Sequence, residues 1–141
     1  MASYFTVACL GTSLSIGATR DHSYMREVVA SLQAGKQSTV SDFNFSMDGG
    51  GSGTGGLPNY PLAAGLRPDA VLIEYSMNDC VAVSGTLADA QARTTTIING
   101  IKAISPSTSI FLMTMNTLLG SSAPVTARST LASHYAMYRT L

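Results

Sequence analysis

Three polar segments of the sequence carry groups that could perform acyl-transfer chemistry. An apolar run ends in Gly11-Thr12-Ser13, so the Ser13 hydroxyl would stand at the end of a buried strand and could act as a nucleophile. The glycine-rich segment 48–56 could bring backbone N–H groups close to a ligand, because no side chains intrude there. Asn78 adds a neutral amide donor. Together, these donors could hold the negative oxygen of a tetrahedral intermediate.

The elements that must position these segments alternate between strand-like and helix-like runs. This alternation predicts an α/β fold in three α/β/α layers, with a flavodoxin-like parallel sheet of four strands. The carboxyl ends of parallel strands share one edge of the sheet, so the three segments should meet there. We predict strands over about Phe5–Leu10, Thr39–Phe45, Ala70–Tyr75 and Ser109–Met115, helices over about Ser23–Ala34, Tyr60–Gly65, Thr86–Ile104 and Thr126–Leu141, and loops over 48–56 and 76–80.

The three segments, each placed after a predicted strand, resemble the sequence blocks of the SGNH (GDSL-type) hydrolases, a family of esterases and lipases. Gly11-Thr12-Ser13-Leu14-Ser15 is similar to the first block, Gly-Asp-Ser-Leu-Ser, which puts Ser13 at the nucleophile position. Ser52-Gly53-Thr54 is similar to the second block, with Gly53 at the oxyanion-hole glycine. Ser76-Met77-Asn78-Asp79 is similar to the third block, Gly-x-Asn-Asp, with Asn78 as the side-chain donor.

The resemblance spans nearly the whole chain and implies a catalytic mechanism. A serine esterase of this type works through an acyl-enzyme intermediate and needs no metal or cofactor. Small acyl esters or O-acetylated carbohydrates are the substrates that the resemblance implies.

The sequence departs from the family pattern in one way that affects catalysis. Thr12 and Ser76 replace an aspartate and a glycine, but the fourth block, Asp-x-x-His, is absent, and with it the base and its orienting acid. We therefore expect residues 1–141 to be a single domain that is truncated at its C-terminus. The fifth strand would be missing, and the fourth would form an exposed edge. The alternative is a catalytically incomplete module that binds a ligand or a partner.

Each candidate residue also has a structural interpretation. Ser13 could cap a helix, Asn78 could form an Asx turn, and the glycine run could be a flexible loop or a phosphate cradle. Asp79 is expected to bond loop amides. The two histidines, His22 in a loop and His134 on the last predicted helix, are expected to be solvated or packed residues and not the base.

Composition excludes several classes of partner. The formal net charge is zero and only 11% of residues are charged, so nothing favours nucleic acid or an anionic membrane surface. No apolar run reaches the roughly 20 residues that span a bilayer, and the N-terminus lacks a basic region, which favours a cytoplasmic protein. The two cysteines, Cys9 and Cys80, suit a reducing compartment, although both fall near the same end of the sheet and a bridge between them stays open.

Overall fold

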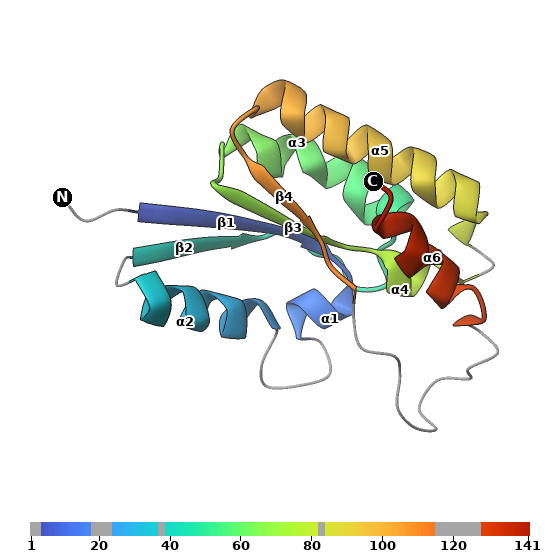
Figure 1. The fold of residues 1–141 in the computed structure, drawn as a ribbon, viewed down its shortest axis with the longest axis horizontal. Coiled ribbons are helices and arrows are strands. Elements are labelled where there is room, and N and C mark those ends of the chain that lie inside the picture. Colours follow the sequence, from blue (N-terminus) through green and yellow to red (C-terminus); the bar gives the residue numbers. More distant parts are fainter. Residues whose placement is uncertain (1–3, 18–23, 37–38, 82–83, 115–127) are drawn as a thin grey trace.

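A parallel sheet between helices forms the centre of the computed structural model, which describes residues 4–17, 24–36, 39–81, 84–114 and 128–141 (Figure 1). All three strand pairings are parallel, and the strand order is β2-β1-β3-β4. This confirms the predicted α/β class and the four-stranded parallel sheet. The strands are β1 (Tyr4–Gly11), β2 (Thr39–Asn44), β3 (Ala70–Glu74) and β4 (Ser109–Leu112).

Helices cover both faces of the sheet (Figure 1). The helices α1 (Ser13–Ile16) and α2 (Tyr24–Lys36) lie on one face, and α3 (Leu57–Gly65) and α5 (Leu87–Ile104) lie on the other. Two more helices meet near the carboxyl ends of the strands, the short α4 (Ser76–Asp79) and α6 (Leu131–Tyr138). The carboxyl ends of the central strands β1 and β3 therefore lie next to short helices.

The core on the α3 and α5 side forms because β3 is an apolar run that is buried along its whole length. Apolar residues of α5 recur at helical spacing and face this strand. The helix starts sharply at Thr86, whose side chain accepts the Asp89 N–H while the Asp89 carboxylate accepts the Thr86 N–H. The fully buried cluster comprises Ala8, Leu10, Ala63, Ala64, Val71, Ile73, Tyr75, Ile97 and Ile101.

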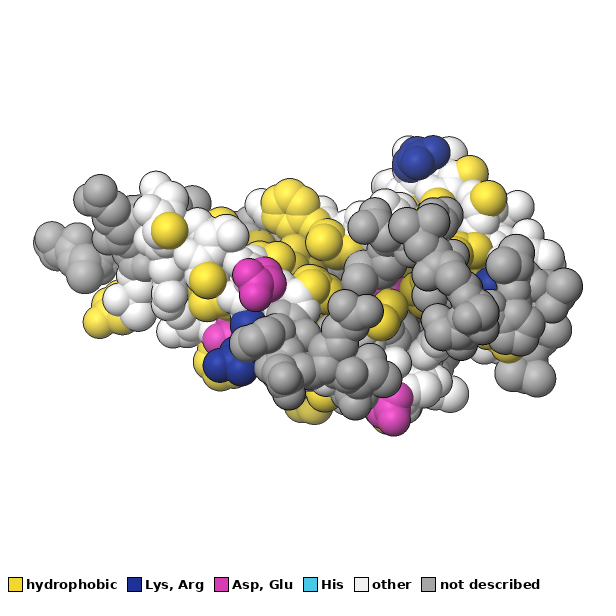
Figure 2. Space-filling model, turned by 90° about the horizontal axis from the view of Figure 1, so that it is seen from below, with side chains coloured by type: hydrophobic (Ala, Val, Ile, Leu, Met, Phe, Trp, Pro, Cys, Tyr) yellow, Lys and Arg dark blue, Asp and Glu magenta, His cyan; other side chains and the backbone are white. Residues whose placement is uncertain are grey.

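The described residues cover the opposite face of the sheet only in part. Helix α2 packs there through the buried Met25, but an apolar groove of about 350 Å³ stays open beside it. Figure 2 shows hydrophobic side chains gathered on this face. Phe111 lies on β4, the outer strand of the described sheet, and is 51% exposed. The fourth strand thus has the outer place expected for it in the described sheet, and a missing fifth strand stays a prediction.

Two segments that we predicted as loops are helical. Ser52–Gly56 forms a turn of π-helix, η1, that runs directly into α3, and part of 76–80 forms α4. Glycine disfavours helix, but the start of η1 is fixed from outside, because the Asp79 carboxylate accepts the Ser52 N–H at 2.9 Å. The strands β3 and β4 end earlier than predicted, and the last helix is shorter, with residues 126 and 127 outside the described residues.

The junction between η1 and α3 gives a test of core packing. A Cβ on Gly56 would lie 2.5 Å from Ile97 Cδ1 and 2.9 Å from Tyr75 Cε2, and both side chains are completely buried. Gly56→Ala should therefore lower the free energy of unfolding by about 1–3 kcal/mol, measured by urea denaturation. Gly35→Ala is the matched control, because it meets no atom within 4 Å on the exposed surface of α2 and should stabilise slightly. Equal stabilities of the two variants would contradict the prediction.

Candidate active site

Hydrogen bonds connect the end of β1, the loop after β2 and the helix α4 that follows β3. Met47, which follows β2, donates its backbone N–H to the carbonyl of Gly11 at 3.0 Å. The Asn78 side chain, on α4 after β3, donates to the carbonyl of Gly50 at 2.8 Å. The segments that carry the three sequence blocks therefore touch one another at the carboxyl edge of the sheet.

Ser13 is the half-buried first residue of α1, directly after its N-cap. The turn that presents it is tight, because a Cβ on Gly11 would collide with the Ser15 hydroxyl, which explains the glycine at this position. The next residue, Leu14, packs against a buried cluster that includes Met77 and Cys80. This contact brings α1 against the loop after β3, which carries Asn78.

A buried carboxyl group lies behind this turn. Glu74, the last residue of β3, is fully buried, and its Oε2 accepts a hydrogen bond from the Thr12 hydroxyl at 2.6 Å. The Thr12 oxygen in turn accepts the Leu14 N–H at 3.4 Å as the N-cap of α1. Glu74 Oε1 has no hydrogen-bond partner among the described residues. Burial raises the pKa of Glu74 to about 7, although the Thr12 hydrogen bond opposes this shift.

Asn78 is half-buried and anchored on two sides. Its amide nitrogen carries two N–H groups, of which one bonds Gly50, so the other can donate to a ligand. Its backbone carbonyl accepts the Ser84 hydroxyl at 2.8 Å. These contacts fix the position of the side chain, as an oxyanion donor requires. The role itself stays a prediction.

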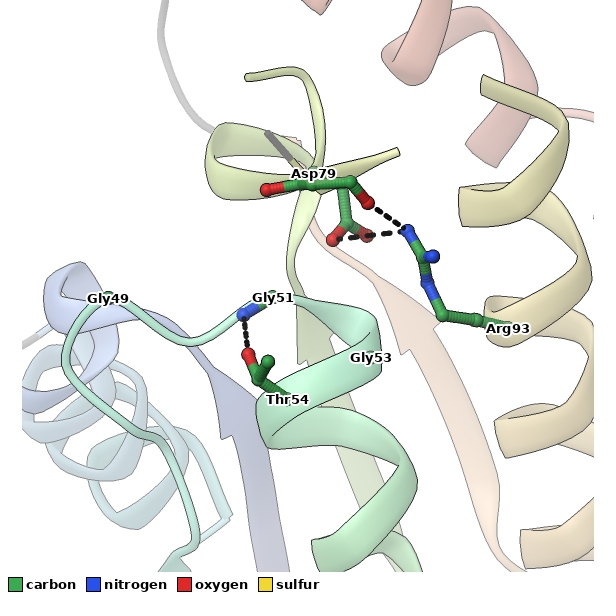
Figure 3. Close-up of a pocket in the computed structure, with 7 residues that line it drawn as sticks. Gly49, Gly51, Gly53, Thr54, Asp79 and Arg93 are labelled. Carbon is green, nitrogen blue, oxygen red and sulfur yellow. Dashed lines mark hydrogen bonds and ion pairs between the residues drawn. The ribbon is translucent and has the colours of Figure 1, made fainter. Parts of the chain in front are cut away.

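Gly53 lies in the first turn of η1, where backbone N–H groups have no partner within the helix. It also lines a pocket of about 360 Å³, which Figure 3 shows between η1, α4 and α5. Ser13 and Asn78 are not among the lining residues, so this pocket lies beside the predicted nucleophile and not around it. The lining residues are Gly49, Gly51, Gly53, Thr54, Asp79, Ser84 and Arg93.

Asp79 and Arg93 face each other in this pocket (Figure 3). The Asp79 carboxylate accepts the Ser52 N–H, which confirms the expectation that it bonds a loop amide. The Arg93 guanidinium lies 4.0 Å from Asp79 Oδ1 and donates from Nε to the Ser52 hydroxyl at 2.8 Å. Its Nη2 also donates to the Ser84 carbonyl at 2.9 Å.

Of the two histidines, the structure describes only His134. His134 is buried in α6, with Nδ1 at 3.0 Å from the Thr130 carbonyl, and its Nε2 has no partner among the described residues. Among the described residues, no hydrogen bond joins His134 to Ser13. His22 lies outside the described residues. The thiols of Cys9 and Cys80 are free and buried, so no disulfide joins them, and burial raises the pKa of both.

Two charged residues of this region were missed in the sequence. Glu74 could have been noticed as a lone charge in the apolar run from Ala70 to Tyr75. Arg93 gave no signal, because it is one of several polar residues along a long helix. Its partner Ser52 lies far away in the sequence and is brought near only by the fold.

Comparison with solved structures identifies the fold. The chain superposes on AlinE4, a SGNH-hydrolase family esterase, with a TM-score of 0.75 at 18% identity, covering 99% of this chain and 73% of that one. A protein from Parabacteroides merdae described as a GDSL-like lipase gives a TM-score of 0.82 at 15% identity, with the same coverage. A variant of Axe2, an acetyl-xylooligosaccharide esterase from Geobacillus stearmophilus, gives 0.76 at 18% identity, covering 99% and 72%.

Sequence comparison adds nothing to this assignment, since no family model and no curated protein matches the chain. At such low identities, the structural matches establish a shared fold and leave the activity to be argued from the site. Of the helices in the described ranges, none combines the length and hydrophobicity required for a membrane span.

Proposed function

We propose that this chain, whose fold is that of the SGNH-hydrolase esterases, is a serine esterase acting on small acyl esters or O-acetylated carbohydrates. One observation supports this most strongly. Hydrogen bonds join β2 to the carbonyl of Ser15 in α1, the loop after β2 to the end of β1, and the same loop to Asn78, so Ser13 and Asn78 lie on segments that are connected at one edge of the sheet. A nucleophile and neutral donors held on such a framework suit acyl transfer.

In the proposed reaction, Ser13 Oγ attacks the ester carbonyl carbon while its proton passes to a base. The carbonyl oxygen becomes negative and accepts hydrogen bonds from the backbone N–H groups of Ser13 and Gly53 and from the Asn78 amide. The bond to the alcohol oxygen then breaks, and the alcohol leaves with the proton. Water attacks the acyl-serine, releasing the acid and restoring the hydroxyl.

A second candidate function is a ligand-binding module with this fold but without catalysis. It is favoured by the surroundings of His134, whose ring bonds a backbone carbonyl of its own helix and not Ser13. Without a base, most of the rate enhancement of a serine hydrolase is lost, although an oxyanion hole alone retains some.

Labelling with a fluorophosphonate probe in the presence of added imidazole separates the two functions. Imidazole supplies a base from solution, so a serine beside an oxyanion hole should react even if the chain itself provides no base. We expect one adduct, located by mass spectrometry on the peptide that carries Ser13, and none on urea-denatured protein. An adduct on another serine would contradict the proposal, and no adduct on the folded protein would favour the binding module.

A further inference from the structure

The pocket beside the oxyanion loops contains opposite charges that balance each other. Among the described residues that line it, only Arg93 and Asp79 are charged, and their charged groups lie 4.0 Å apart. A ligand that carries a net charge would be attracted by one of them and repelled by the other. The pocket therefore favours a neutral ligand that can both donate and accept hydrogen bonds.

The contacts of Arg93 fix its side chain but leave some of its N–H groups available to a ligand. Its side chain is 22% exposed, with Nε and Nη2 bonded to Ser52 and Ser84. Its Nη1 carries two further N–H groups and has no acceptor among the described residues. A guanidinium fixed in this way can bind a ligand oxygen without losing much side-chain freedom.

Asp79 offers the complementary acceptor. The side chain is 98% buried, its Oδ1 accepts the Ser52 N–H, and its Oδ2 has no partner among the described residues. An unpaired buried carboxylate oxygen is costly, so a donor that reaches it would stabilise the site.

Glycine creates the room for this arrangement. A Cβ on Gly53 would approach Arg93 Cδ to 3.2 Å, and a Cβ on Gly51 would lie 2.6 Å from Asp79 Oδ1 (Figure 3). Any other residue at either position would press on one of the two charged groups. The pocket thus gives a reason for glycine at positions 51 and 53 in addition to the oxyanion role proposed for Gly53.

We propose that this pocket is a subsite for a neutral, hydroxylated group of the ester substrate, of the size of one sugar ring, bound by Arg93 and Asp79. The inference rests on the proposed esterase function. A sugar hydroxyl can accept from the guanidinium and donate to the carboxylate, and a volume of about 360 Å³ falls in the range of small-ligand sites. The pocket shares its glycine wall with the loop bonded to Asn78, so the alcohol part of an ester would lie next to the predicted reaction site.

Titration of the ¹⁵N-labelled protein with methyl β-xylopyranoside tests the subsite by NMR without needing catalysis. We expect saturable shifts of the amides of Gly49, Gly51, Gly53 and Thr54, with a dissociation constant in the millimolar range, and none with cyclohexanol, which offers a ring with one hydroxyl. Arg93→Met should weaken binding at least about tenfold, because it removes charged donors but keeps the aliphatic stem. Arg67→Met is the matched control, since Arg67 is exposed before β3 at the other end of the sheet.

The outcomes of this titration are separable from those of the serine labelling. Sugar-induced shifts at the pocket in Ser13→Ala would support the subsite even if the probe never labels Ser13. Labelling of Ser13 with no shifts at the pocket, or with shifts elsewhere, would overturn the subsite and leave the esterase standing. If the spectrum of Arg93→Met shows loss of structure, Arg93→Lys is titrated in its place. The location of the shifts in the protein of natural sequence then still decides whether the pocket binds the sugar.

Discussion

Replacing Ser13 by alanine should abolish the protein-dependent hydrolysis of p-nitrophenyl acetate. The hydroxyl supplies the bond to the acyl group, and neither the donors at Asn78 nor those of η1 can replace it. Loss of the nucleophile in a serine hydrolase costs up to about 10⁶-fold in kcat, and the remaining rate comes from the oxyanion hole and binding. Because Ser13 is only half-buried at the start of α1, the variant should keep its stability.

The measurement compares initial rates in buffer with imidazole, corrected for hydrolysis by imidazole alone. Ser107→Ala is the matched control, because it removes an exposed serine hydroxyl from the turn before β4, at the opposite edge of the sheet. Equal protein-dependent rates for Ser13→Ala and the natural sequence would eliminate Ser13 as the nucleophile. A rate indistinguishable from zero in both would support the binding module.

Replacing Glu74 by glutamine should change how stability depends on pH. The pKa of Glu74 rises from 4.5 to about 7 in the folded state, because burial disfavours the charged form. Below about pH 4.5 the Glu74 carboxyl group is protonated in both the folded and the unfolded protein, so it does not make the free energy of unfolding depend on pH. As the pH rises toward 7, the unfolded chain ionises first, so the free energy of unfolding falls by about 3 kcal/mol and stays low above that pH.

Glutamine does not titrate. The free energy of unfolding of Glu74→Gln, minus that of the natural sequence, should therefore increase by about 3 kcal/mol from about pH 4.5 to about pH 8. Urea denaturation across this range measures the difference, which is independent of any constant cost of placing the amide beside Thr12. Glu27→Gln, which removes an exposed carboxylate on α2, is the matched control. A difference between Glu74→Gln and the natural sequence that is the same at both pH values would contradict the prediction.

The sheet and its long helices could be predicted from the sequence because their signals are local. The apolar run at Ala70–Glu74 and the Thr86 cap before α5 each identify an element without knowledge of its neighbours. The structure of Ser52–Gly56 could not be predicted in this way. Its helical turn depends on the Asp79 carboxylate, whose distance along the chain hides it from any local pattern.

The place of the candidate residues in the fold could be predicted, but their surroundings could not, and their catalytic roles stay predictions. The order of the blocks around Ser13 and Asn78 placed them at one sheet edge, and the loops that carry them are indeed bonded together. The contacts of Glu74 with Thr12 and of Arg93 with Ser52 join residues that are far apart in the sequence. Spacing alone contains no information about such pairs.

The position of β1 inside the sheet has a consequence for synthesis on the ribosome. Tyr4 pairs with Thr39, and Val7 pairs with Ala70, so β1 emerges from the ribosome before either of its two partner strands. At about 5–20 residues per second, the nascent chain carries this apolar segment unpaired for some seconds before its second neighbour is made. During that interval β1, which later delivers Ser13 to the edge of the sheet, is an unpaired apolar segment that a chaperone could protect.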